Sequence, residues 1–75
     1  MINEINELIG NKQFQEAKEL LDVALKDSGD DLELLKLLGL THVNLQLWND
    51  AKKNFETVVK FNQDDATSWF YLASC

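Results

Sequence analysis

Few side chains of this 75-residue chain could do chemistry, and they are scattered along it. His42 is the only histidine and Cys75 is the only cysteine. A histidine can serve as a general base or a metal ligand, but no second histidine and no cysteine lies at ligand spacing from His42. We therefore interpret His42 as a residue that packs between helices and Cys75 as an exposed terminal thiol. No catalytic residue, metal ligand or cofactor is predicted.

Two pairs of adjacent acids, Asp30-Asp31 and Asp64-Asp65, could indicate carboxylate catalysis or calcium binding. Each pair precedes a segment with helical spacing, and neither fits the calcium loop of an EF-hand. A carboxylate at the start of a helix accepts hydrogen bonds from free backbone N–H groups and is favoured by the helix dipole. We interpret both pairs as helix caps. Since no nucleotide-binding loop or Ser–His–Asp set is present either, an enzyme is not predicted.

The charge of the chain excludes further classes of function. Acidic residues number 13 and basic residues 7, all of them lysine, for a net charge of −6. Nucleic-acid binding depends on clustered basic residues, with arginine as the usual base reader, so neither nucleic acid nor an anionic membrane is an expected partner. No apolar run approaches the roughly 20 residues of a membrane span, and no secretion signal is recognisable. We expect a cytoplasmic protein.

The most informative pattern is a repeat at 34 residues. Chemically similar residues recur at this distance, for example Phe14 with Trp48 and Leu21 with Phe55. Identical residues recur at six pairs of positions: Ala17 and Ala51, Lys18 and Lys52, Lys26 and Lys60, Asp30 and Asp64, Asp31 and Asp65, and Leu38 and Leu72. Because the agreement falls on apolar, small and capping positions, it indicates a repeated structural unit.

Apolar residues at helical spacing predict five helices joined by short turns. Asp31 is expected to cap the third helix, and Gly29 suits a left-handed end of the second. Gly39 lies within a helix, where glycine costs about 1 kcal/mol relative to alanine, so we expect another backbone to approach it closely. The predicted helices span residues 2–9, 13–27, 32–45, 48–61 and 66–74.

These segments resemble the tetratricopeptide repeat, a 34-residue helix–turn–helix with the pattern W-x₂-L-G-x₂-Y, then A-x₃-F, then P. The pair Leu38-Gly39 matches the Leu-Gly of the pattern, and Ala51 and Phe55 match its second helix. Three positions depart from it: Leu35 stands for the Trp, His42 for the Tyr and Gln63 for the Pro.

The resemblance implies an all-α fold in which antiparallel helix pairs stack as a right-handed superhelix of five helices. Residues 1–75 would form one domain, in which 1–31 is a degenerate first repeat, 32–65 a complete repeat and 66–75 the first helix of a third. The resemblance also implies which residues pack within and between the repeats: Phe14, Ala17, Leu21, Leu35, Leu38, Gly39, His42, Trp48, Ala51, Phe55, Trp69 and Leu72.

In function, the resemblance implies a protein–protein interaction module, an adaptor or scaffold. Such repeats hold a segment of a partner protein in a concave groove lined by their first helices. The alternative is a structural or oligomerisation segment of a larger repeat protein, with no peptide-binding role of its own. The expected groove residues are Ile2, Asn6, Ile9, Glu33, Lys36, Leu40, Val43, Asn44, Thr67, Phe70 and Ser74.

Some relatives in this family grip a partner's terminal carboxylate with lysine, asparagine and arginine side chains. Near the expected groove this chain offers only Lys36 and Asn44, and it has no arginine. We therefore predict that it has no carboxylate clamp of that kind.

The last predicted helix carries the adjacent aromatic residues Trp69, Phe70 and Tyr71. Adjacent residues of a helix point about 100° apart, so the three rings cannot all face one neighbour. We expect Trp69 and Leu72 to pack inward, Phe70 to face the groove and Tyr71 to lie uncovered. An uncovered helix suggests either a piece of a longer repeat array or a homodimer formed through residues 66–75.

Overall fold

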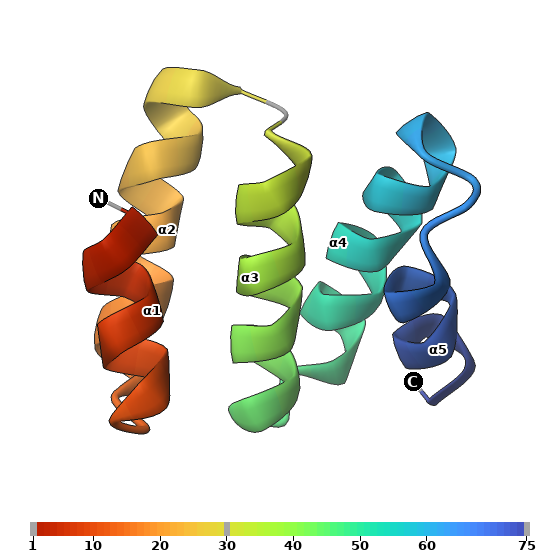
Figure 1. The fold of residues 1–75 in the computed structure, drawn as a ribbon. Coiled ribbons are helices and arrows are strands. Elements are labelled where there is room, and N and C mark those ends of the chain that lie inside the picture. The colour runs from red at the N-terminus through yellow and green to blue at the C-terminus, as the bar shows by residue number, and fades with distance from the viewer. Residues whose placement is uncertain (1, 30, 75) are drawn as a thin grey trace.

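The computed structural model describes residues 2–29 and 31–74, without the side chain of Ile2. Within this part the chain is all-α and has no strand, as predicted (Figure 1). Each predicted helix agrees with an observed one to within one residue at either end. The five helices are α1 (Ile2–Gly10), α2 (Phe14–Ser28), α3 (Leu32–Asn44), α4 (Trp48–Phe61) and α5 (Ala66–Ser74).

The ends of the helices follow from particular residues. The carboxylate of Asp31 accepts hydrogen bonds from the backbone N–H groups of Glu33, at 3.1 Å, and Leu34, at 3.4 Å, and so caps α3. At the end of α2, Gly29 has a φ of 72° and a ψ of −133°, a positive-φ conformation that glycine adopts at least cost. The predicted cap at Asp31 is confirmed, whereas Gly29 ends α2 with the expected positive φ but not with the ψ of a left-handed helix.

The turns after α1 and α3 have the same backbone conformation, 34 residues apart. Lys12 and Gln46 occupy equivalent positions, with φ values of 63° and 61°. In both turns the next residue donates its backbone N–H to the carbonyl five residues earlier, at 2.8 Å. A left-handed residue followed by such a bond is a common way of closing a helix. The repeat in the sequence is therefore also a repeat of structure.

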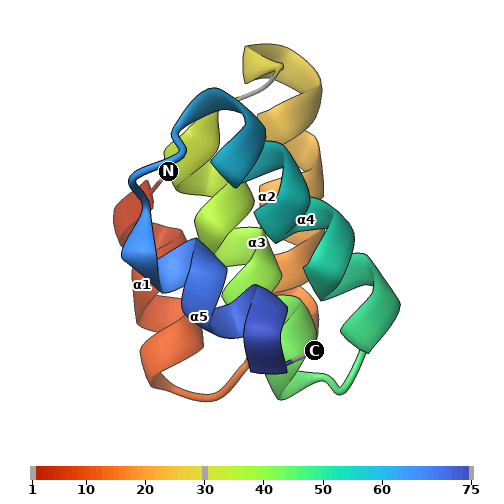
Figure 2. The same cartoon turned by 90° about the vertical axis from the view of Figure 1, so that its right-hand side faces the viewer.

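Neighbouring helices in the chain pack against each other: α1 on α2, α2 on α3, α3 on α4 and α4 on α5. Figures 1 and 2 show that α1, α3 and α5 lie along one side of the molecule and that α2 and α4 lie along the other. Short turns between amphipathic helices produce this alternation, because each helix can bury its apolar stripe only by folding back on the one before. The result is a short stack of helix pairs.

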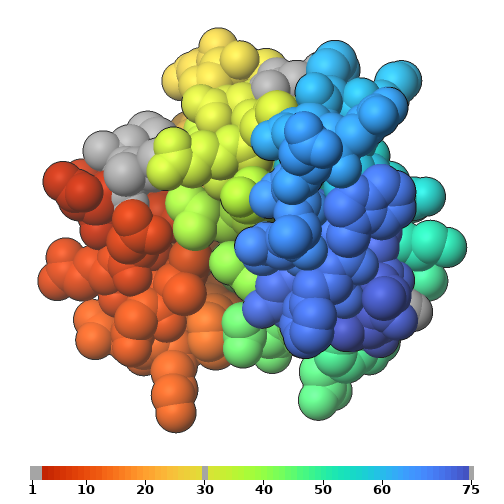
Figure 3. Space-filling view, turned by 45° about the vertical axis from the view of Figure 1, so that its right-hand side comes forward, coloured from red at the N-terminus to blue at the C-terminus, as the bar shows by residue number. Residues whose placement is uncertain are grey.

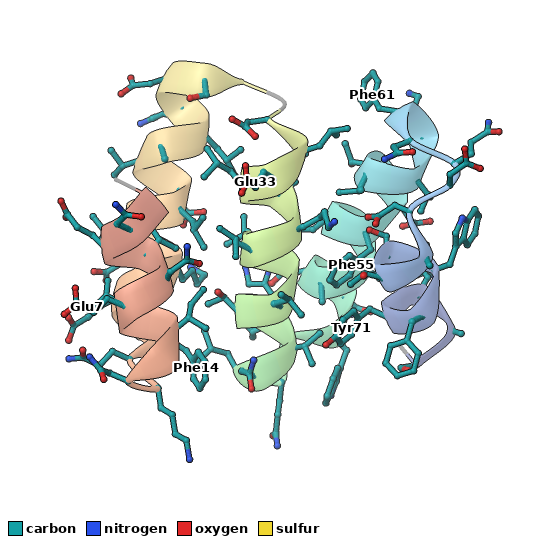
Figure 4. The ribbon with its side chains drawn as sticks, in the orientation of Figure 1. Glu7, Phe14, Glu33, Phe55, Phe61 and Tyr71 are labelled. Carbon is teal, nitrogen blue, oxygen red and sulfur yellow. The ribbon has the colours of Figure 1, made fainter. Side chains whose placement is uncertain are left out.

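The buried residues lie in the two seams of this stack. Between α1, α2 and α3 the buried cluster consists of Ile5, Leu21, Ala24, Leu34 and Leu38. On the other side of α3, Phe55 of α4 is fully buried and its ring stacks on that of Tyr71 in α5 (Figure 4). The ring centroids are 5.1 Å apart and the planes differ by 10°, an arrangement that adds to the gain from burial.

The close neighbour of Gly39 is a side chain and not a backbone, which corrects the prediction. A Cβ atom at this position would lie 2.6 Å from Cζ and 2.7 Å from Cε2 of Phe55. Glycine therefore makes room for the ring that fills the space between α3 and α4. A glycine inside a helix thus identified the site of close approach but not the group that approaches it.

The orientation of α5 also differs from the prediction. Ser68 is fully buried and Tyr71 lies against Phe55, whereas Trp69 is 51% exposed. The cause lies at the start of the helix, where the Ser68 hydroxyl donates to Asp65 at 2.5 Å and the indole N–H of Trp69 donates to the carbonyl of Gln63 at 2.8 Å. These bonds turn Ser68 inward and hold Trp69 at the surface.

Trp48, expected among the packing residues, is 49% exposed, whereas its equivalent Phe14 is half-buried. Figure 4 shows Phe14 between the lower ends of α2 and α3. The described part of α5 has 9 residues where α3 has 13, so it is about 6 Å shorter. It therefore does not extend over Trp48 as α3 extends over Phe14.

Candidate functional site

The face formed by α1, α3 and α5 is concave. In the turned view of Figure 2 and in the space-filling view of Figure 3, α3 is set back between α1 on one side and α5 on the other. The predicted groove residues come from these three helices. They are brought to one side of the molecule because each turn reverses the chain and so returns every second helix to the same face.

A hollow of about 480 Å³, here termed the α3 hollow, lies between the first part of α3 and the end of α4. It brings together three of the predicted groove residues, Glu33, Lys36 and Leu40, on successive turns of α3. Its other lining residues are Leu32 and Leu37 of α3, Val58 of α4 and Asn62. The lining is mainly apolar, with one amide and two charged groups, which is a composition typical of ligand-binding clefts.

The positive charge in this hollow is already paired. Nζ of Lys36 lies 3.2 Å from Oδ1 of Asp65, the residue that precedes α5. The hydrogen bond from Ser68 lowers the pKa of Asp65 from its ordinary value and Lys36 lowers it further, while burial opposes them in part. Asp65 therefore stays ionised at neutral pH and ties α3 to the start of α5.

Glu33 is the charged residue of the α3 hollow that is not paired in this way. Its side chain is exposed, and within the described residues no lysine lies within ion-pair distance of it. Figure 4 shows it projecting from the first turn of α3. A surface that combines apolar groups with an unpaired carboxylate suits a partner segment in which an apolar side chain lies next to a positively charged side chain.

The other predicted groove residues lie outside the α3 hollow. On α1, Asn6 is exposed and Ile9 is half-buried against the core, while the side chain of Ile2 lies outside the described part of the structure. On α5, the side chains of Thr67, Phe70 and Ser74 are exposed. The hydroxyl of Ser74 donates to the carbonyl of Phe70, at 3.1 Å.

Two predicted groove residues lie at the end of α3. Val43 is half-buried and Asn44 is exposed. The amide nitrogen of Asn44 donates to the carbonyl of Leu40, at 2.8 Å, so part of its hydrogen-bonding capacity is used within its own helix.

Sequence reasoning missed several residues of this site. Leu37 could have been found, because residues 33, 36, 37 and 40 follow the i, i+3, i+4, i+7 spacing of one helix face. Asn62 and Asp65 could not, since they come from a connection whose course depends on how α5 packs. Asp65 was expected only as a cap.

His42 lies within the packing between α3 and α4, as predicted. The side chain is buried, and its Nδ1 lies 2.6 Å from Oδ1 of Asn54. Among the described residues, no three His, Cys, Asp or Glu side chains are grouped so that they could hold a metal ion. No described helix combines the length and the apolar character that crossing a membrane requires.

Comparison with known proteins agrees with the architecture. A sequence model of the tetratricopeptide repeat family matches residues 8–74, which is nearly the whole chain. No curated protein matches the chain, and no solved structure does.

Proposed function

This chain belongs to the tetratricopeptide repeat family, and on that basis we propose that it binds a segment of a partner protein in the concave groove lined by α1, α3 and α5. Repeats of this family generally mediate protein–protein interaction and are typically non-catalytic. Within the chain we assign residues 32–65 as a complete repeat, 1–31 as a degenerate repeat and 66–75 as the first helix of a third.

The observation that carries the proposal is the α3 hollow. Its apolar lining comes from Leu32, Leu37 and Leu40 of α3, the central helix of the concave face, and from Val58 of α4. Contiguous exposed apolar surface with polar residues at its rim is typical of binding sites.

The test is a matched pair of substitutions. Leu40→Glu places a charge in the α3 hollow, while Val23→Glu places the same charge at an exposed apolar position of α2, a helix that does not line the hollow. We expect a partner captured by the native chain to be retained by the Val23 variant and lost by the Leu40 variant. Equal binding by both variants would refute the groove as the binding site.

The second candidate function is self-association through residues 66–75. It is supported by the exposure of Trp69 and of Phe70, which is 65% exposed, on neighbouring positions of α5. If self-association is the main role, Leu40→Glu leaves the mass of the native oligomer in solution unchanged, whereas substitutions on α5 reduce that mass.

A further inference from the structure

A second hollow, of about 810 Å³, lies between α4 and α5. Its floor is apolar and consists of Val59, Trp69 and Leu72. Its rim carries two lysines and two acids, Lys52, Lys60, Glu56 and Asp64. We term it the α5 hollow. It lies outside the groove and is larger than the α3 hollow.

The internal repeat identifies this surface as one that is covered elsewhere in the same chain. Trp69 and Leu72 are equivalent to Leu35 and Leu38, 34 residues earlier. Those leucines are only 9% and 5% exposed, whereas Trp69 is half-exposed and Leu72 half-buried. The same positions of the repeat are thus buried in α3 and open in α5.

Trp69 is held in place at this surface. Its indole N–H donates to the carbonyl of Gln63, at 2.8 Å, so the ring is fixed before anything binds to it. A fixed aromatic side chain loses little conformational entropy on binding, and tryptophan is enriched among residues that dominate interface energies. The ring is therefore suited to anchor a contact.

The charges at the rim indicate what covers the hollow. The chain as a whole carries a net charge of −6, so two copies repel at most orientations. At the α5 hollow the two lysines and two acids balance, and none of the four takes part in an ion pair among the described residues. A two-fold contact requires a self-complementary surface, and a balanced rim can set each lysine against an acid of the other copy.

We propose that the α5 hollow is the interface of a two-fold dimer in which Trp69 of each copy packs into the hollow of the other. Lys52 and Lys60 of one copy then face the acids Glu56 and Asp64 of the second. This inference rests on the proposed self-association and specifies its surface. It leaves the α3 hollow free, since the two hollows share no lining residue.

The first experiment measures the dimer dissociation constant of the native chain by sedimentation. Trp69→Ala is expected to weaken the dimer about 30-fold, the effect of losing a central anchor. Trp48→Ala is the control, because Trp48 is also a half-exposed tryptophan but does not line the hollow. Circular dichroism of each variant verifies that the helices remain.

The second experiment reverses the rim. Two variants give the rim charges of one sign only. The all-negative variant is Lys52→Glu, Lys60→Glu, the all-positive variant is Glu56→Lys, Asp64→Lys, and each is expected to be monomeric. Mixed in equal amounts, they are expected to form a heterodimer at the native mass. A native dimer that Trp69→Ala leaves intact, or reversed variants that fail to pair, would overturn this interface while leaving self-association standing. A native chain that stays monomeric at every concentration would refute both.

Discussion

Gly39 of α3 and the ring of Phe55 in α4 approach so closely that a Cβ atom on Gly39 would lie 2.6 Å from the ring carbon Cζ. The ring cannot easily retreat, because it is fully buried and stacked on Tyr71 of α5. One missing side chain on α3 thus lets a single aromatic side chain of α4 bridge to α5. This contact fixes the spacing of α3, α4 and α5, of which α3 and α5 lie on the concave face.

Gly39→Ala should therefore destabilise the fold, although alanine is the better helix former. Overpacking a well-packed core costs about 1–3 kcal/mol, and the gain in helix propensity offsets about 1 kcal/mol of it. We expect the free energy of unfolding to fall by about 1 kcal/mol, measured by urea denaturation.

Gly10→Ala is the matched control, since a Cβ atom at this position meets no atom within 4 Å. It should leave stability unchanged or raise it by about 0.5 kcal/mol. The double variant Gly39→Ala, Phe55→Leu should lose less stability than the sum of the two single losses, because a smaller side chain faces the new methyl group. Equal effects of the two alanine substitutions would show that the contact at Gly39 is not tight.

Most of the fold could be predicted because its determinants are local in the sequence. Asp31 and Gly29 mark a helix start and a helix end through their own backbone chemistry. The 34-residue recurrence identified the stacked pairs, and it reappears in the matching turns at Lys12 and Gln46. These signals depend on neighbouring residues and need no knowledge of tertiary packing.

What could not be predicted depends on contacts between distant residues. The orientation of α5 is set by the bonds of Ser68 to Asp65 and of Trp69 to Gln63, which override the apolar pattern. The pairing of Lys36 with Asp65 joins residues 29 positions apart. Periodicity places a residue on a helix face, but it does not tell which face a neighbour will cover.

Substitution of Lys12 or Gln46 by glycine should stabilise the fold. Both are non-glycine residues with positive φ, a conformation that costs an L-residue about 1–2 kcal/mol. Glycine avoids this cost, but it also gives the unfolded chain more conformational freedom, which offsets part of the gain. We expect Lys12→Gly and Gln46→Gly each to raise the free energy of unfolding by about 0.5–1 kcal/mol in urea denaturation. Asn11→Gly, next to one of them but without positive φ, should give no gain. A loss of stability in either turn variant would contradict the strain assigned to it.

Acid should weaken the fold partly through Asp65. Because Ser68 and Lys36 lower the pKa of this carboxyl below 3.8 in the folded state, the unfolded chain binds more protons in the interval between the two pKa values. The stabilisation that ionised Asp65 contributes is complete above about pH 3.8 and is lost as the pH falls through the pKa that Asp65 has in the folded state. Ser68→Ala removes the largest contribution, so its stability deficit should be greatest near neutral pH and should narrow below about pH 3.8.

The comparison for this variant is Thr57→Ala, which also removes a hydroxyl, but one that donates to the carbonyl of Lys53 and not to a carboxylate. Its deficit should stay constant over the same pH range. Urea denaturation of the three proteins between pH 2.5 and 7 makes the comparison. A Ser68→Ala deficit that does not change with pH would remove Asp65 from the acid dependence.

The groove should not bind the acidic C-terminal peptides that other repeats of this family grip by their carboxylate. Lys36 is paired with Asp65 at 3.2 Å, and the amide of Asn44 donates to its own helix, so both candidate ligands are engaged within the chain. Fluorescence anisotropy with a labelled acidic chaperone peptide should show no saturable binding in the micromolar range. An amidated peptide of the same sequence is the control, because it lacks the terminal carboxylate. Micromolar binding that disappears on amidation would demonstrate a clamp and would require Lys36 to leave Asp65.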